Sequence, residues 1–279
     1  MRVRGLPYPV MGMGSPLSLA RTKGGGYEAE ALALFARFTA PPVAERKGLI
    51  NTLIKSLKAA GVWTKLDALY LFAAADAQAA RQNWIQDLYN ATAVSSPTFT
   101  ADRGYAGDGA SAYVNSNFNA TTASSPKFVQ DSAHVSGWNL TSRAANNTSL
   151  LGARESTTKY IDIVPRAIGD LYIGRLNGNG TAVSTANSNS TGLFTINRSA
   201  SNALQGYRNG ASLGTSANVS AGSPNAQLIM LARSLTGAGP DSWTTDQIAA
   251  VCFGSSLTSV EEAAKYAAIL TYLQAVGAA

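Results

Sequence analysis

The sequence is poor in the residues that support disulfide, metal and nucleophilic chemistry. Its 279 residues include one cysteine and one histidine. No intrachain disulfide can form, clustered Cys and His ligands for zinc are excluded by the count, and we expect no cofactor. Cys252 stands in the apolar run 248–253, which predicts a small buried side chain. His134 is the one base that a Ser-His-Asp triad could use, and we interpret it instead as a hydrogen-bonded histidine in a strand.

Acidic residues are also scarce. There are 16 Asp and Glu residues against 22 Lys and Arg residues, and the formal net charge is +6. Some glycan hydrolases built from β-sheets place two or three carboxylates at alternate positions of one strand, so that these side chains share a face. No strand-like segment has a Glu-x-Asp or Asp-x-Glu pattern, and Glu155 and Asp162 are too far apart to serve. We therefore expect a protein that is not an enzyme.

Long hydrophobic runs are absent too. No stretch approaches the roughly 18 apolar residues of a membrane span, and the first residues lack a continuous apolar segment, so we expect no membrane span and no secretory signal. Residues 1–26 hold four basic residues and no acid, which leaves +2 of the net +6 for the rest of the chain. Because a duplex-binding surface needs Lys and Arg gathered on one face, nucleic-acid binding by the body is disfavoured.

Residues 1–26 contain three prolines, the glycine run 24–26 and no apolar periodicity that could build a core. We interpret this segment as an extended arm that docks on a neighbouring chain, because the glycine run lets it point away from the residues that follow. The alternative is that the arm wraps around its own body. The candidate anchors of the arm are Arg2, Arg4, Tyr8, Leu17, Leu19 and Arg21.

Residues 27–65 are expected to form a helical module. Apolar residues recur at helical spacing over 27–38 and again over 43–60, with Pro41 and Pro42 as the break between the two helices. Gly61 is the natural end of the second helix. The apolar stripes of this helical hairpin must pack on each other, on the body or on a partner.

Residues 66–279 have the pattern of an antiparallel β-sandwich. Short segments of period two alternate with Gly, Asn, Ser and Thr, and the pair Asn209-Gly210 favours a tight type I′ hairpin. A final helix is predicted after Thr258, since Thr258 and Glu261 have the spacing of a capping box. We expect this helix to cover an edge or an end of the sandwich.

Several of these segments together resemble a known fold family. The strand 68–72, the run 99–109 that leads into 112–114, the hairpin at 207–210 and the run 253–258 before the final helix are similar to laminin-G-like, concanavalin-A-like jelly rolls. Residues 49–118, with the motifs at 66–70 and 104–109, further resemble a group of bacteriophage virion proteins, tail- or head-associated, that carry this fold. The resemblance covers roughly residues 45–277 and its motifs are specific only as a set.

The resemblance implies a mainly β jelly roll with a place on a virus particle, and it implies no reaction. The partners would be other virion proteins bound through the arm and, since particle sites are symmetric, further copies of the chain in a homo-oligomer. A host surface glycan is the candidate ligand. Such a protein would be made in the host cytoplasm and would reside in the virion as a decoration, a spike or an adhesin.

Glycan binding is the sharpest functional option for the jelly roll itself. Exposed aromatic rings stack on sugars, although an aromatic residue of a sandwich is usually core. The long polar loop 177–192 offers a second binding surface or an exposed decoration. The alternatives to a virion protein are a soluble lectin-like module and, less favoured, a glycan hydrolase. The possible glycan contacts are Trp138, Tyr172, Tyr207 and Trp243, and the weak calcium candidates are Asp102 and Asp108, for which a role in turns is the stronger interpretation.

Overall fold

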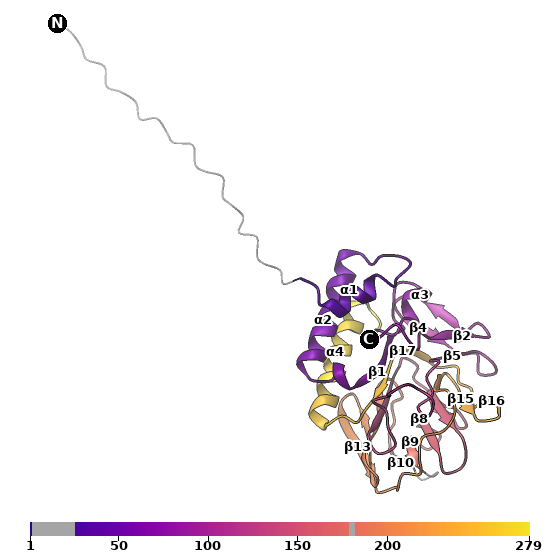
Figure 1. Cartoon of the computed structure of the whole chain (residues 1–279). Coiled ribbons are helices and arrows are strands. Elements are labelled where there is room, and N and C mark those ends of the chain that lie inside the picture. The colour runs from indigo at the N-terminus through magenta and orange to yellow at the C-terminus, as the bar shows by residue number, and fades with distance from the viewer. Residues whose placement is uncertain (2–25, 179–181) are drawn as a thin grey trace.

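The chain forms two antiparallel sheets packed face to face, with three longer helices on one side (Figure 1). The computed structural model describes residues 1, 26–178 and 182–279. The predicted mainly β sandwich with a C-terminal helix is confirmed. The predicted docking arm, with its six anchors Arg2 to Arg21, lies outside the described residues.

The first sheet has the strand order β13-β12-β11-β6-β17-β4-β3, and β1 shares one edge of β17 with β4. The hairpin between β12 and β13 turns through Asn209 and Gly210, whose φ values of 51° and 75° confirm the predicted type I′ turn. The strands of this sheet are β1 (Leu66–Leu71), β3 (Thr98–Thr100), β4 (Gly104–Ala106), β6 (Ala133–Asn139), β11 (Gly192–Ala200), β12 (Ala203–Arg208), β13 (Ala211–Ser216) and β17 (Gln247–Gly254).

The second sheet has the order β10-β9-β8-β7-β14-β5-β2, and the short β15 runs parallel to β7 and pairs with β16. The loop expected over 177–192 is corrected here, because four of its residues pair with β9 as a strand, β10. The strands of this sheet are β2 (Thr92–Val94), β5 (Tyr113–Asn115), β7 (Leu151–Arg154), β8 (Tyr160–Ala167), β9 (Leu171–Gly178), β10 (Val183–Ala186), β14 (Ile229–Met230), β15 (Arg233–Leu235) and β16 (Ala238–Asp241).

The core lies between the two sheets and continues under the helices. Ile161 and Ile163 of β8 point inward, which leaves the alternate residues of that strand on the outer face of the second sheet. Gly137 of β6 allows the sheets to approach, since a Cβ at this position would lie 2.9 Å from the side chain of Leu151 and 3.0 Å from that of Leu150. The inner faces are therefore closely packed at this position.

The helices cover the outer face of the first sheet. α1 (Ala29–Phe35) packs on α2 (Ala44–Ala59), and α2 packs on α4 (Ser259–Ala275). α4 covers more than the predicted edge: it contacts the edge strand β13 and also lies across β6 and β11, where Tyr266 stacks on Trp138 at 5.7 Å and Lys265 reaches Ser136. The reason is that β6 directs side chains such as Trp138 and Ser136 outward, and α4 shields them from solvent. The remaining helical turns are η1 (Trp63–Lys65) and α3 (Ala77–Ala80).

The predicted signals at the ends of the helices are confirmed. The Thr258 hydroxyl accepts a bond from the Glu261 amide at 3.3 Å, and the Glu261 carboxylate accepts one from the Thr258 amide at 2.7 Å, which is the capping box. Gly61 follows α2 with a positive φ of 71°. None of the helices in the described part of the chain is long and apolar enough to cross a membrane.

Candidate functional site

Three of the four predicted glycan contacts are core residues, which corrects that prediction. Trp138 is 4 % exposed beneath α4, Tyr172 is 0 % exposed and Tyr207 is 2 % exposed. The Tyr172 ring stacks on Phe194 between the sheets, and its hydroxyl donates to the carbonyl of Thr195 at 2.9 Å. Trp138 is buried because α4 covers it, and Tyr172 is buried because the opposite sheet covers the inner face of β9.

Trp243 is the predicted contact that reaches the surface. It is half-buried, and its ring lies at a tilt against Tyr113 with 5.8 Å between centroids. Tyr113 also lines an open groove of about 340 Å³ that contains the amide side chains of Asn115, Asn225 and Gln227. Trp243 therefore remains a predicted contact, at a site that is separate from the deeper pocket described below.

The two calcium candidates are engaged by protein groups. The Asp102 carboxylate accepts from Arg46 at 2.6 Å. Asp108 accepts from three successive backbone amides, those of Ala110, Ser111 and Ala112, each at 2.8 Å, and these hydrogen bonds hold the pKa of its carboxyl below its usual range. Asp108 thus holds a turn, as the stronger interpretation of the sequence has it. Asp102 stands in the turn between β3 and β4 with a positive φ of 58°, and its carboxylate is used by Arg46. In the described part of the chain no three His, Cys, Asp or Glu side chains gather into a metal site.

His134 and Cys252 are buried, as predicted. The His134 Nδ1 lies 2.6 Å from the carbonyl oxygen of Ser255, so Nδ1 carries the proton and donates it. Burial, reinforced by the positive charge of Lys265, keeps the pKa of His134 well below 6.5. Burial likewise raises the pKa of the Cys252 thiol. A neutral imidazole and a protonated thiol, both closed off from solvent, cannot act on an external substrate.

A polar pocket lies on the outer face of the second sheet, and we call it the arginine basin. Its volume is about 440 Å³. Its floor is formed by β8 and β9, and β7, β15 and the loop at 146–148 form its walls. The lining residues used below are Asn147, Thr148, Arg154, Tyr160, Asp162, Ile173, Arg175 and Arg233.

Tyr160 is the centre of the floor and is surrounded by three guanidinium groups. The Cζ atoms of Arg154, Arg175 and Arg233 lie 5.1, 5.1 and 4.8 Å from the centroid of its ring. Such contacts are favourable cation–π interactions. They also cover the ring, which is only 9 % exposed, so Tyr160 is a support for the arginines and not a surface for a ligand.

Asp162 lies beside Tyr160 and is the buried counter-charge of the basin. Its carboxylate accepts from Arg175 at 3.0 Å and from the Ser149 hydroxyl at 2.6 Å, and Arg233 lies 3.5 Å away. Burial raises the pKa of Asp162, and the hydroxyl and the two guanidinium groups oppose that rise. Asp162 therefore fixes the positions of Arg175 and Arg233 from below.

The three arginines differ in how firmly they are held. Arg233 donates two hydrogen bonds to the Asp241 carboxylate, from Nε at 2.9 Å and from Nη2 at 2.7 Å. Arg154 is half-buried at the edge of the basin, and its Nε makes one long hydrogen bond of 3.4 Å to the Ser156 carbonyl. Among the described residues none accepts a hydrogen bond from the two terminal nitrogens of Arg154. These nitrogens are the donors that a ligand can use.

The basin was missed by sequence reasoning because its residues are scattered along the chain. Strand register brings them together: Arg154 is opposite Tyr160 in the pairing of β7 with β8, and Asp162 is opposite Arg175 in the pairing of β8 with β9. The alternation of Tyr160 and Asp162 with inward isoleucines is a visible signal in the sequence. It does not say which arginines lie across from them.

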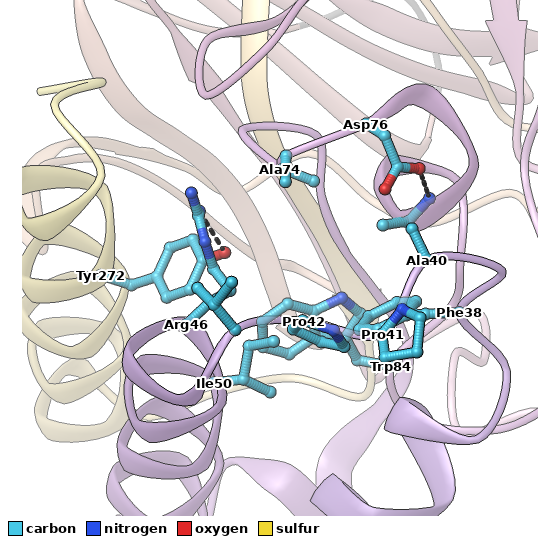
Figure 2. Close-up of a pocket in the computed structure, with 13 residues that line it drawn as sticks. Phe38, Ala40, Pro41, Pro42, Arg46, Ile50, Ala74, Asp76, Trp84 and Tyr272 are labelled. Atoms are coloured by element: carbon cyan, nitrogen blue, oxygen red, sulfur yellow. Dashed lines mark hydrogen bonds between the residues drawn. The ribbon is translucent and has the colours of Figure 1, made fainter.

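A second cavity, mostly apolar, lies at the helical side of the molecule (Figure 2). Its volume is about 180 Å³, and Phe38, Pro41, Pro42 and Trp84 form one wall. Arg46 points across it and donates to the Tyr272 hydroxyl at 3.3 Å while pairing with Asp102. Since Arg46 is already paired on both sides, this cavity offers an apolar volume and little directional bonding.

No protein-family model matches the chain, and no curated protein matches its sequence. Solved structures do match. Trypanosoma rangeli sialidase in complex with sialic acid is similar over 81 % of this chain and 39 % of the sialidase chain, with 11 % identity and a TM-score of 0.53. The binding domain of botulinum neurotoxin serotype D is similar over 76 % of this chain and 52 % of that chain, with 13 % identity and a TM-score of 0.51.

A third match is domain 4 of AbnA, an extracellular arabinanase from Geobacillus stearothermophilus, in complex with arabinotriose. It covers 72 % of this chain and 98 % of that domain, with 13 % identity and a TM-score of 0.45. This chain spans about two fifths of the sialidase and about half of the toxin domain. At these identities the likeness concerns the fold alone, that of a two-sheet β-sandwich.

Proposed function

We propose that the protein is a carbohydrate-binding β-sandwich module and that the arginine basin is its saccharide site. The observation that carries this proposal is the basin itself: a pocket of about 440 Å³ on rigid strands, with hydrogen-bonding side chains directed into it from several elements. Pockets that hold small ligands have volumes of roughly 300–1,000 Å³. The sialidase that is similar in fold is described in complex with sialic acid, which is consistent with a saccharide ligand.

We propose further that binding is not followed by catalysis. Most enzymes that cleave glycosidic bonds use a carboxylic acid that donates a proton and a second carboxylate that acts opposite to it, whereas sialidases use a tyrosine as the nucleophile. In the basin the ring of Tyr160 is covered by three guanidinium groups. Asp162 is the carboxylate that lines the basin, and it is occupied by Arg175 and Ser149. Glu155 lies outside the basin lining and pairs with Lys159 at 3.0 Å. Neither group has the partner that hydrolysis needs.

The test is to screen the full chain against a broad panel of immobilised glycans and to repeat the screen with a blocked basin. Ile173→Trp places an indole in the basin from β9. Leu171→Trp is the matched control, because Leu171 lies two residues earlier on the same face of β9 and does not line the basin. Binding that is lost in the first variant and kept in the second supports the proposal. If the unaltered chain binds no glycan of the panel, the proposal is refuted. Binding that is lost only in Trp243→Ala would place the site at the groove lined by Tyr113 and Asn115.

We also propose, as the sequence resemblance implies, that the module is displayed on a bacteriophage particle as part of a symmetric oligomer. One feature of the fold supports a display role. The described chain enters α1 on the side covered by helices, whereas the basin lies on the outer face of the opposite sheet (Figure 1). An attachment through residues 1–26 would thus leave the basin directed away from the particle.

Incorporation into particles tests this second proposal. A chain that begins at Tyr27 is expected to bind saccharide like the full chain and to be absent from purified particles. Normal incorporation of the shortened chain would eliminate the arm as the attachment device.

A further inference from the structure

We infer that the saccharide bound by the arginine basin carries a carboxylate, as sialic and uronic acids do. This inference rests on the proposed saccharide-binding function and narrows its ligand class. Three guanidinium groups, those of Arg154, Arg175 and Arg233, gather around Tyr160, and two carboxylates, Asp162 and Asp241, contact them. One positive charge is left without a counter-charge inside the basin.

The charged groups around the basin do not change this count. Glu155 is paired with Lys159, and Arg166 is paired with Asp170 at 2.7 Å. Each of these pairs is neutral as a whole. The excess positive charge therefore belongs to the basin and is carried by Arg154, whose terminal nitrogens bond none of the described residues.

The basin also lacks what a neutral sugar needs. Neutral sugars bind in water largely by stacking their C–H faces on exposed aromatic rings. Tyr160 is the aromatic residue of the basin lining, and three guanidinium groups cover it. Affinity must therefore come from polar contacts, and charge-assisted hydrogen bonds are about twice as strong as neutral ones.

The geometry of Arg154 suits a carboxylate. A guanidinium presents two parallel N–H groups that match the two oxygens of a carboxylate. Arg233 is already engaged with Asp241 in this way, and Asp162 holds Arg175. Arg154 is thus the arginine that meets the ligand, and Asn147 and Thr148 on the adjacent wall offer neutral donors and acceptors for sugar hydroxyls.

The experiment compares matched acidic and neutral saccharides by isothermal titration of the full chain. The pairs are sialyllactose with lactose, and digalacturonate with its methyl ester; a sulfated lactose is the third probe. The variants are Arg154→Gln, which removes the positive charge, and Arg154→Lys, which keeps the charge but lacks the two parallel N–H groups of the guanidinium. Arg166→Gln is the control, because Arg166 is also a half-buried arginine of the second sheet and does not line the basin.

We expect at least one acidic saccharide to bind at least about tenfold more tightly than its neutral partner, since a hydrogen bond to a charged group is worth about one to two powers of ten in affinity. Arg154→Gln should abolish that preference, Arg154→Lys should keep part of it, and Arg166→Gln should keep all of it. Added salt should lower the affinity for the acidic saccharide and leave the affinity for the neutral one unchanged.

Three results would overturn the inference, and they are distinguishable. If the acidic and neutral saccharides of each pair bind equally tightly, the basin does not select a carboxylate, and the proposed saccharide-binding function is unaffected. A preference for the sulfated sugar over both carboxylates shows an anion site of another class. Failure of every saccharide to bind refutes the proposed function together with the inference. If Arg154→Gln does not fold, the comparison of ligands on the unaltered chain and on Arg154→Lys still decides the question.

Discussion

At the residue scale, the least expected feature is an ion pair sealed inside the molecule. Lys265 and Glu262, both 0 % exposed, lie on the face of α4 that contacts the first sheet, and their charged atoms are 2.8 Å apart. The Lys265 ammonium also donates to the Ser136 hydroxyl at 2.7 Å. Charges are this deeply buried only when they are paired and hydrogen-bonded, so the pair should matter chiefly when one member is lost.

Removal of one partner of this pair is therefore predicted to cost far more than removal of both. Lys265→Met should lower the free energy of unfolding by about 3–5 kcal/mol, because Glu262 is left as an uncompensated buried charge. The double variant Lys265→Met, Glu262→Gln should recover most of that loss. Urea denaturation of the four proteins of the cycle measures the coupling, and additive losses would contradict it.

His134 predicts a pH dependence of stability. The folded pKa is held well below 6.5 by burial, while the unfolded chain titrates near 6.5. Between these two values the unfolded chain binds more protons, so stability should fall as the pH decreases below about 6.5, by at most about 1.4 kcal/mol per pH unit. Above about 6.5 both states are neutral and the effect is absent.

Because the chain contains one histidine, this slope can be assigned to it. His134→Asn keeps a side-chain donor for the Ser255 carbonyl and removes the titration. Urea unfolding between pH 5 and 8 should show the slope in the unaltered chain and a flatter profile in the variant. Parallel profiles would mean that another group is responsible.

At the scale of elements, α4 and the hairpin of β12 and β13 form a contact that depends on a glycine. A Cβ at Gly210 would lie 2.9 Å from the Cα of Ala263, which is backbone and cannot move aside easily. The turn residue thus has two constraints, its positive φ and the helix above it. The sequence signal Asn-Gly accounts for the first constraint only.

Two glycine substitutions separate these constraints. Gly237 also has a positive φ, 74°, but has open space around its missing Cβ. Gly237→Ala should therefore cost about 1–2 kcal/mol for the left-handed backbone alone. Gly210→Ala should cost clearly more, because the methyl group also displaces α4. If the two variants lose equal stability in thermal unfolding, α4 shifts to accommodate the added methyl group and its contact with the hairpin imposes no constraint.

At the scale of the whole molecule, helices and sandwich share one core. Buried residues of α2 such as Leu53 and Leu57 belong to the same apolar cluster as those of β1 and α4. The predicted boundary at residue 65 coincides with a change of secondary structure, and the apolar cluster runs across it. Of the predicted arm at 1–26, the structure describes Met1 and Gly26, and both are exposed and outside this core.

Two shortened chains are predicted to differ accordingly. A chain that begins at Tyr27 should keep the melting temperature of the full chain within about 2 °C, a change well below 1 kcal/mol for a molecule of this size. A chain that begins at Leu66 should be insoluble or unfolded, because it exposes the apolar face that α2 covers. Circular dichroism with thermal melting is the measurement. A folded, soluble chain from Leu66 would establish the helices as a separate module.

The sequence was informative wherever a structural feature depends on neighbouring residues. The capping box at Thr258, the turn at Asn209 and Gly210, the helices over 27–60 and the burial of Cys252 were all predicted, since short-range spacing determines them. Trp138, Tyr172 and Tyr207 were misplaced because strand alternation indicates two faces without saying which face is covered. The first sheet, which carries Trp138 and Tyr207, is covered on one face by the second sheet and on the other by helices, and Tyr172 of the second sheet points toward the first.

By itself, then, the sequence determined a mainly β sandwich, the two helices before it and the capped helix after it, because period, turn residues and caps act over a few positions. Only the tertiary structure decided that α4 seals Lys265 against Ser136 and that Arg154, Arg175 and Arg233 meet over Tyr160. These contacts join residues up to 129 positions apart. They follow from strand register and from sheet packing, which no local pattern specifies.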